Sequence, residues 1–316
     1  MTRRAIILFA ALGVAWGIPY LLIKVAVGEL DPAMVVFARS ALGALLLLPL
    51  ALARRQVLPV LRRWVPLLAY TLVEIVVPWY FLSSAEQRLP SSTAGLLLAA
   101  IPLVGVAVAV LFGRPAKLTL INWLGILAGM LGVAALVGFD VAGSDLLGVA
   151  ELAVVVVGYA FGPAILSRWM SDLPGVGVVA LSLAVTAVLY VPVVSLTGGW
   201  PTRWPSAPVI ASIVTLAVVC SAVAFLLMFA LVAEVGPMRT TTITYLNPAV
   251  AIIAGALVLG ERVTVWTVIG FVLVLGGAYL VTRHRASAEI PAEPEAAVAI
   301  IEDEASPDGP QALGSR

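Results

Sequence analysis

The chain has 316 residues, of which 62% are hydrophobic and only 11% are charged. Because soluble domains are about 45–50% apolar and about 25% charged, this composition excludes an ordinary soluble globular protein. Lys and Arg total 18 against 17 Asp and Glu, and the net charge of +1 predicts no nucleic-acid partner. A single cysteine, Cys220, and a single histidine, His284, argue against an internal disulfide, a zinc site or a His-based triad. We expect no metal and no other cofactor.

Ten apolar stretches follow one another along the chain, each long enough to cross a bilayer, which takes about 20 mainly apolar residues. They cover residues 5–27, 32–53, 64–84, 90–112, 118–138, 146–167, 175–196, 208–231, 240–259 and 264–282. We therefore predict an all-α integral membrane protein with ten transmembrane helices. Residues 283–316 are acidic, contain four Pro and no aromatic side chain, and are predicted to form a disordered cytoplasmic tail.

The basic residues predict the orientation of the chain, because Lys and Arg are retained on the cytoplasmic side. With the N-terminus inside, twelve basic residues fall on the inner side and four on the outer side. We therefore expect both termini in the cytoplasm. The location that fits is the plasma membrane, as a multi-pass protein, and we favour a prokaryotic inner membrane.

The two halves of the chain match each other at an offset of 145–148 residues. The matched segments include Gly13–Gly17 with Gly158–Gly162, Ala85-Glu86 with Ala233-Glu234, and Pro102 with Pro248. Since each half holds five spans, an odd number, the second half enters the membrane in the opposite sense. We predict two inverted five-helix repeats, at residues 1–140 and 141–282. Such repeats place a substrate site near the midplane and expose it alternately to the two sides, so the pattern predicts a transporter.

Several motifs also resemble a known family. They are Trp16-Gly17 followed by Lys24, Phe37-Ala38-Arg39, the Pro102 helix, and the stretch from Asn247-Pro248 to Leu259-Gly260-Glu261-Arg262-Val263-Thr264. Over residues 5–282 they resemble the EamA-like branch of the drug/metabolite transporter superfamily. The resemblance implies ten helices and export of amino acids, related metabolites or drugs. The first half departs from the family in having Gly113-Arg114-Pro115 where Gly-Glu is usual, so the acidic role there is absent or moved.

Two acidic residues inside predicted spans, Glu74 and Glu151, are candidates for proton coupling. An unpaired acid at mid-span costs about 2.5–3.5 kcal/mol on insertion scales, and such residues tend to be functional. Glu74 shares a stripe with Tyr70 and Pro78, which we expect to face the bundle interior. The alternative for Glu74 is a permanently protonated acid bonded to a neighbouring helix carbonyl. The alternative for Glu151, with Tyr159 continuing its face, is an interfacial acid. Tyr70 and Tyr159 are themselves candidates for lining a substrate cavity.

Further candidates for a substrate cavity lie in the first two spans. Trp16 and Tyr20 share a face, and their rings can stack on a substrate or sit at the membrane interface. The interfacial reading is the better one for Trp79, in the third span. Arg39 lies two turns into the second span, where we favour outward snorkelling or pairing with an acid over substrate contact. We expect Lys24 to hold the outer end of its helix, with binding of a substrate carboxylate as the alternative.

The ninth span begins with unusually many polar side chains. Thr244 and Asn247 are predicted to share a face, with Tyr245 beside them. Proline frees an upstream carbonyl, and free backbone groups at membrane depth are tolerated where they line a cavity. We therefore predict that these three residues line the cavity and that Pro102 and Pro248 form matched helix kinks. Hydrogen bonding between helices is the alternative for the polar side chains.

Together these patterns favour a secondary exporter of small metabolites, amino acids or amphipathic drugs that works by alternating access, with proton coupling as a hypothesis. Its partners would be a small-molecule substrate, the lipid bilayer and protons, and the sequence favours no oligomeric state. The alternatives are an uncoupled facilitator and a lipid or lipid-linked-sugar flippase. We expect no enzymatic activity, because an intramembrane enzyme would need a nucleophile-and-base or metal set that the sequence lacks.

Overall fold

A computed structural model describes residues 2–112, 119–139, 145–236 and 240–283. Every regular element within these ranges is helical, which confirms the predicted all-α class for the described part of the chain. Nearly all of the predicted tail, residues 284–316, lies outside the described residues, and so does the Gly113-Arg114-Pro115 segment.

Long helices account for most of the described chain. They are α1 (Arg3–Gly17), α2 (Pro19–Ala26), α3 (Pro32–Ala53), α4 (Val57–Leu61), α5 (Trp64–Thr71), α6 (Val77–Arg88), α7 (Ser91–Leu97), α8 (Ile101–Leu111), α9 (Leu120–Phe139), α10 (Leu146–Trp169), α11 (Gly175–Thr197), α12 (Ala207–Ala217), α13 (Ala224–Val235), α15 (Leu246–Leu259) and α16 (Val265–Arg283). Within the described residues, nine helical stretches are long and apolar enough to cross a membrane, from Arg3–Ala26 to Thr242–Leu259. Val265–Val281, in the tenth predicted span, is a shorter apolar helix.

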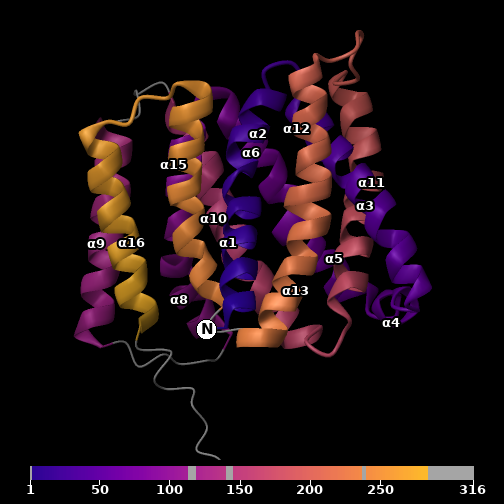
Figure 1. The fold of residues 1–316 in the computed structure, drawn as a ribbon, viewed down its shortest axis with the longest axis horizontal. Helices are drawn as coiled ribbons and strands as arrows, with labels where there is room; N and C mark the ends of the chain where they lie inside the picture. The colour runs from indigo at the N-terminus through magenta and orange to yellow at the C-terminus, as the bar shows by residue number, and fades with distance from the viewer. Residues whose placement is uncertain (1, 113–118, 140–144, 237–239, 284–316) are drawn as a thin grey trace, which may run out of the picture.

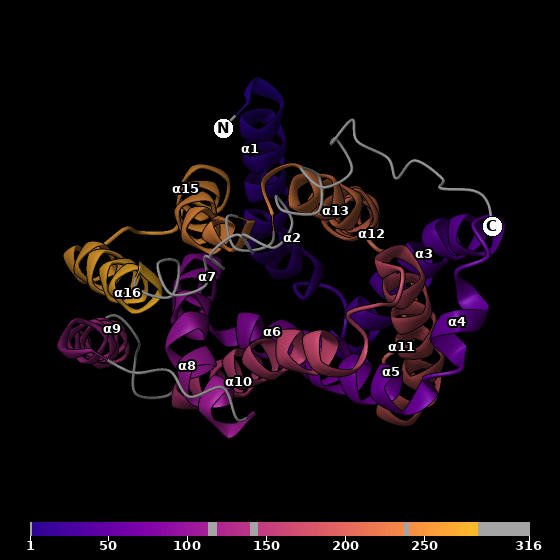
Figure 2. The same cartoon turned by 90° about the horizontal axis from the view of Figure 1, so that it is seen from below.

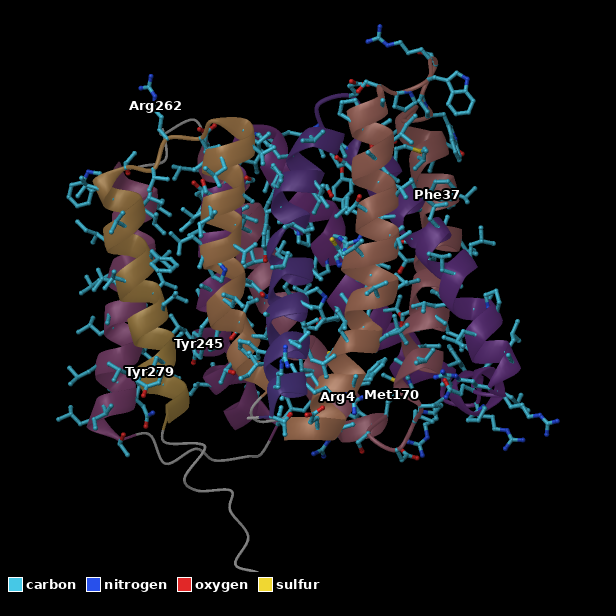
Figure 3. The ribbon with its side chains drawn as sticks, in the orientation of Figure 1. Arg4, Phe37, Met170, Tyr245, Arg262 and Tyr279 are labelled. Carbon is cyan, nitrogen blue, oxygen red and sulfur yellow. The ribbon has the colours of Figure 1, made fainter. Side chains whose placement is uncertain are left out.

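The helices stand side by side and pair across the two halves of the chain (Figures 1 and 2). The pairs are α1 with α13, α3 with α11, α6 with α10, α7 with α15, and α9 with α16. Each pair joins a helix from the first half to one from the second, so the core is built between the halves. In Figure 1 the N-terminus and the C-terminal end of α16 both lie at the lower end. We call this the lower end, and the opposite end, where Figure 3 labels Arg262, the upper end.

The outward surface of the bundle is apolar, as a membrane environment requires. Leu45, Leu120 and Leu257 expose 70%, 75% and 81% of their surface. Hydroxyl side chains such as Ser40, Thr71 and Ser221 are fully buried instead. Polar groups inside and leucines outside fit a chain whose outer face contacts lipid.

Four spans depart from α-helical geometry, at matched places in the two halves. The third span contains a π-helical turn, η1 (Leu72–Val76), and the eighth contains another, η4 (Val218–Val223). The fourth span contains a 3-10 turn, η2 (Leu98–Ala100), and the ninth begins with a 3-10 segment, η5 (Thr241–Tyr245). The two π turns and the two 3-10 segments are separated by nearly the offset of the sequence repeat.

Prolines explain three of these departures. A proline has no amide hydrogen, and its ring clashes with the carbonyl four residues earlier. Pro78, Pro102 and Pro248 each lie four residues after a member of η1, η2 or η5. The chain therefore departs from α-helical geometry just before Pro102 and just before Pro248, the two prolines at which we predicted kinks. In η4 a side chain intervenes instead, because Ser221 Oγ donates to the Leu216 carbonyl, five residues earlier, over 2.9 Å.

Candidate functional site

Glu74 lies in the π-helical turn η1, near the middle of the third span. The turn packs against α10, where a Cβ atom built on Gly162 would lie 2.7 Å from Cδ of Glu74. On α11, Tyr190 donates its hydroxyl to the Val76 carbonyl over 2.7 Å, which satisfies a backbone group of the turn. Oε2 of Glu74 is buried and has no hydrogen-bond partner among the described residues. An ionised carboxylate is costly in such a position, so this carboxyl needs a proton or a cation.

Other predicted site residues gather around Glu74. Tyr70, one turn earlier and 5% exposed, and Tyr159 of α10 both lie within electrostatic range of Glu74. Tyr20 of α2 and Arg39 of α3, which are 8% and 7% exposed, lie within electrostatic range of Tyr159. We call Tyr20, Arg39, Tyr70, Glu74 and Tyr159 the central cluster. The structure thus brings together five of the residues proposed from sequence, contributed by both halves.

Arg39 is held differently from what the sequence predicted. Its Nε donates to Ser221 Oγ over 3.1 Å, and its Cζ lies 3.7 Å from the centroid of the Trp79 ring. The side chain is buried, and no carboxylate oxygen of a described residue lies within 4.0 Å of its nitrogens. The expectation of snorkelling or pairing with an acid was therefore wrong. Its partner Ser221 is 182 residues away and is presented by the π turn η4, which the sequence pattern did not reveal.

Aromatic side chains extend the cluster. Trp16, one turn before Tyr20, packs its ring edge-on against Phe225 at a centroid distance of 5.9 Å. The Tyr20 ring lies against Gly95 of α7. Trp79 is only 6% exposed beneath Arg39, so the interfacial position expected for it is wrong. These rings give the interior a surface that is apolar yet able to contact a cation or a π system.

Glu151 is paired with other polar groups, in contrast to Glu74. Ser84 donates to its Oε1 over 2.8 Å, and Arg88 donates to its Oε2 over 2.9 Å. The carboxylate is 8% exposed and joins α10 to the last two turns of α6. A charge that is already compensated in this way is suited to holding two helices together.

The ninth-span candidates contact neighbouring helices. Tyr245 donates its hydroxyl to the Ala278 carbonyl of α16 over 3.1 Å, in the lower half of the molecule (Figure 3). Asn247 lies against Gly17 of α1, and its Oδ1 is buried without a hydrogen-bond partner in the described part of the chain. Thr244 lies in the 3-10 segment η5, whose tighter turn alters the face it was expected to share with Asn247. Tyr245 therefore makes the kind of contact given as the alternative, and cavity lining by the other two stays a prediction.

Sequence reasoning missed Glu86, near the C-terminal end of α6. Its side chain is fully buried, and neither carboxyl oxygen has a hydrogen-bond partner among the described residues. Lys24 is adjacent and donates to the backbone carbonyls of Glu86 and Leu89 over 2.6 and 2.9 Å. Lys24 thus holds helix ends together, as predicted, by capping α6 at the upper end. A sequence feature that could have identified Glu86 is its match with Glu234 at the corresponding position of the second half.

Glu261, in the Gly-Glu motif that carried the family resemblance, caps a helix. The amides of Ser91 and Ser92, at the start of α7, donate to its two carboxyl oxygens over 2.7 and 3.0 Å. Partial burial raises the pKa of Glu261, but these hydrogen bonds outweigh burial and hold the pKa below its ordinary value. Gly260 before it has φ +66°, a conformation that glycine adopts without strain. The motif therefore joins the loop after α15 to the N-terminus of α7.

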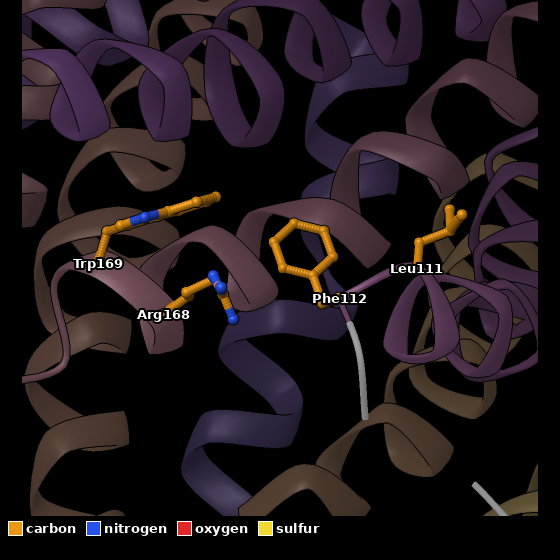
Figure 4. A pocket seen from close by; sticks show the side chains of 4 residues that line it. All are labelled: Leu111, Phe112, Arg168 and Trp169. Carbon is orange, nitrogen blue, oxygen red and sulfur yellow. The ribbon is translucent and has the colours of Figure 1, made fainter. Parts of the chain in front are cut away.

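A hollow of about 410 Å³ opens at the lower end between α8 and α10 (Figure 4). Its lining residues are Leu111, Phe112, Arg168 and Trp169. Phe112 meets Trp169 at a centroid distance of 5.8 Å, and the Arg168 guanidinium lies 5.7 Å from the same indole ring. This hollow is separate from the central cluster, none of whose side chains lines it.

The fold and the buried polar cluster define a polytopic membrane protein, and comparison with known proteins identifies its class. The model of the EamA-like transporter family matches twice, at residues 3–138 and 146–283. The chain belongs to this family and is a membrane transporter.

Individual relatives agree with this assignment. The chain is 29% identical to the inner membrane transporter YedA of Escherichia coli K12 over 280 residues, 85% of this chain and 90% of YedA. It is 25% identical to the transporter YvbV of Bacillus subtilis 168 over 303 residues, 90% of this chain and 93% of YvbV. A solved crystal structure superposes with a TM-score of 0.65 at 23% identity, over 90% of this chain and 98% of that chain, and it shares the fold. The expected location, a multi-pass protein of the plasma membrane, is confirmed.

Proposed function

We propose that the protein is a secondary transporter that works by alternating access and couples transport to protons at Glu74. The observation that carries the proposal is the Glu74 carboxyl, which lies near mid-span in a π-helical turn, with its Oε2 buried and unpartnered among the described residues. A carboxyl that is stable only when protonated or beside a cation can exchange one for the other as access to the two sides changes.

The proposed architecture consists of two inverted five-helix repeats, at residues 1–140 and 141–282, with both termini and the tail 283–316 in the cytoplasm. Three findings support it. The family matches once in each half. The π and 3-10 turns recur at the offset of the sequence repeat. The most extensive helix pairs cross between the halves, which suits motion of one half against the other.

Two basic residues at matched positions of the two halves suggest how the upper and lower ends of the molecule would open in turn. Lys24 lies in the last turn of α2 and Arg168 in the last turn of α10, the corresponding helix ends of the two halves. Lys24 ties the upper end to α6, whereas Arg168 is exposed beside the hollow at the lower end. Inverted repeats exchange roles between states. We therefore expect Arg168 to bind carbonyls at the C-terminal end of α13 in the state in which Lys24 releases α6.

The substrate class proposed is small metabolites, amino acids or amphipathic drugs, and the direction proposed is export. Tyr20, Tyr70 and Tyr159 lie within electrostatic range of Arg39 or Glu74, and Trp16 lies one turn before Tyr20. These rings beside a cation and an acid suit a substrate that is part apolar and part charged. Uncoupled movement is an alternative that the transport experiment separates by its response to the pH gradient. A lipid substrate is the alternative if no member of the panel is transported.

The test is transport by the purified protein in liposomes, with and without an imposed pH gradient. We expect the wild type to accumulate a substrate from a panel of amino acids and cationic drugs when the gradient is present. Glu74→Gln should lose the response to the gradient, because the amide cannot exchange a proton. Glu151→Gln is the matched control, since it removes a carboxylate already paired with Arg88, and we expect it to keep the response. Equal transport by wild type and Glu74→Gln under the gradient would contradict coupling at Glu74.

A further inference from the structure

We propose that Arg39 is the binding site for the carboxylate of a small organic anion, and that this anion is the transported substrate. The proposal rests on the proposed function and narrows its substrate class. It starts from a charge that the described residues do not balance.

The Arg39 guanidinium is a buried cation with most of its hydrogen-bonding capacity unused. It carries five N–H donors, and within the described chain only Nε donates a hydrogen bond, to Ser221. The Trp79 ring covers one face of the guanidinium at 3.7 Å, which leaves its edge as the direction for a further partner. Charged side chains within spans are rare and are normally paired. A planar guanidinium edge with two free terminal nitrogens matches a carboxylate, which binds it through two parallel hydrogen bonds.

The groups that face Arg39 are neutral and mostly aromatic. They are Tyr20 on α2, Trp79 on α6, Tyr159 on α10, and Cys220 and Ser221 on η4. None supplies a negative charge beside the guanidinium, so the counter-charge has to come from outside the described chain. The rings would instead contact the apolar body of the ligand. The chemistry predicted is therefore a carboxylate on an aromatic or aliphatic skeleton.

The position of Arg39 links binding to the transport cycle. Arg39 belongs to the first half, whereas Ser221 and Tyr159 belong to the second. An anion bound at Arg39 would thus contact both halves at once and would be sensitive to their relative motion. Tyr159 lies within electrostatic range of both Arg39 and Glu74, so the anion would sit close to the proposed proton site.

Binding is measured directly on the full-length purified protein, so that it does not depend on transport. The probes are matched carboxylate and amide pairs, such as 3-phenylpropionate with 3-phenylpropionamide and hexanoate with hexanamide, at up to millimolar concentration. Tryptophan fluorescence reports binding, because Trp79 lies against the guanidinium, and Trp79→Phe identifies the signal. We expect the carboxylate of at least one pair to bind at least about tenfold more tightly than its amide.

Variants of Arg39 test whether this residue causes the preference for a carboxylate over its amide. Arg39→Gln should abolish the discrimination between carboxylate and amide, and Arg39→Lys should retain it at reduced affinity, because an ammonium keeps the charge but not the planar edge. Arg63→Gln, which removes an exposed arginine paired with Asp172 at the lower end, is the matched control and should bind like the wild type. Arg39→Lys keeps the proposal testable if Arg39→Gln does not fold. If a monodisperse Arg39→Lys protein no longer distinguishes carboxylates from amides, the proposal is overturned.

The outcomes separate this proposal from the proposed function. Carboxylate binding that depends on Arg39 without any transport would support the site and contradict the transport cycle. Transport of carboxylates and amides at equal rates, unchanged in folded Arg39→Gln, would support transport and overturn the site. No response to any carboxylate would also overturn it. A lipid control uses the protein in neutral nanodiscs to which phosphatidylglycerol is added. If the Trp79 fluorescence responds to this lipid but not to soluble carboxylates, the ligand is a lipid headgroup and the proposal is overturned.

Discussion

Acidic residues with buried or partly buried carboxyl groups divide according to whether the carboxyl has a hydrogen-bond partner. Glu151 has Ser84 and Arg88, and Glu261 has the amides at the start of α7. Glu74 and Glu86 lack hydrogen-bond partners for buried carboxyl oxygens within the described chain. A carboxylate with hydrogen-bond partners stabilises the fold. A buried carboxylate without partners destabilises the fold and is retained where function requires it. This distinction, rather than the presence of an acid in a span, favours Glu74 over Glu151 as the proton site.

Glu261→Gln tests the cap assigned to the Gly-Glu motif. An amide oxygen is a weaker acceptor for the α7 amides and carries no charge for the helix dipole, so we expect a loss of about 1 kcal/mol in stability at pH 7. The pKa of Glu261 is lowered in the folded state, so its stabilising effect is present above the ordinary carboxyl pKa of 4.5 and is lost as the pH falls through the lower folded-state pKa.

Thermal unfolding in detergent between pH 7 and pH 3 measures this effect. The difference between wild type and Glu261→Gln should shrink as the pH falls below about 4.5. Arg262→Gln, a change of the exposed neighbouring charge, should unfold like the wild type throughout. A Glu261→Gln protein as stable as the wild type at pH 7 would refute the capping role.

At the scale of elements, regular structure could be predicted from sequence and irregular structure only in part. Hydropathy located the helices because lipid-facing residues are apolar along whole spans. The turns at Pro102 and Pro248 could be anticipated, since proline acts on its own helix. The η4 turn could not, because it has no proline four residues after it, and its Ser221 side chain bonds to Arg39 from the other half. For the same reason the surroundings of Arg39 were missed, whereas an inward-facing Glu74 with a buried Oε2 could be predicted from the stripe that it shares with Tyr70.

Close packing of α10 on η1 yields a prediction at this scale. Gly162→Ala places a methyl group where the Glu74 carboxyl now lies, and the carboxyl has to move. We expect transport driven by a pH gradient to fall together with thermal stability, because the added Cβ atom would also lie 2.9 Å from Cβ of Glu74, so that the turn η1 or α10 has to shift as well.

Gly105→Ala on α8 is the matched control. A Cβ atom at Gly105 would meet no atom of another described element within 4 Å, so this variant should transport and unfold like the wild type. If Gly162→Ala responds to the pH gradient as fully as Gly105→Ala, the packing of α10 does not hold the Glu74 carboxyl in its functional position.

For the whole molecule, the two halves share one interior. Both contribute to the central cluster, and the most extensive helix pairs cross between them. The upper end is tied by Lys24, and the lower end has the hollow beside Arg168. A protein built in this way is expected to open the cluster to one side at a time as the halves move.

Accessibility of the central cluster from the two sides tests this claim most directly. The sole cysteine, Cys220, is replaced by alanine, and Tyr159→Cys then provides one thiol in the cluster. A membrane-impermeant thiol reagent is applied to right-side-out and to inverted vesicles, with and without a pH gradient, and Cys220→Ala alone gives the background. We expect labelling from both sides, with the two rates changing in opposite directions when the gradient is imposed. Labelling from one side only under every condition would contradict alternating access.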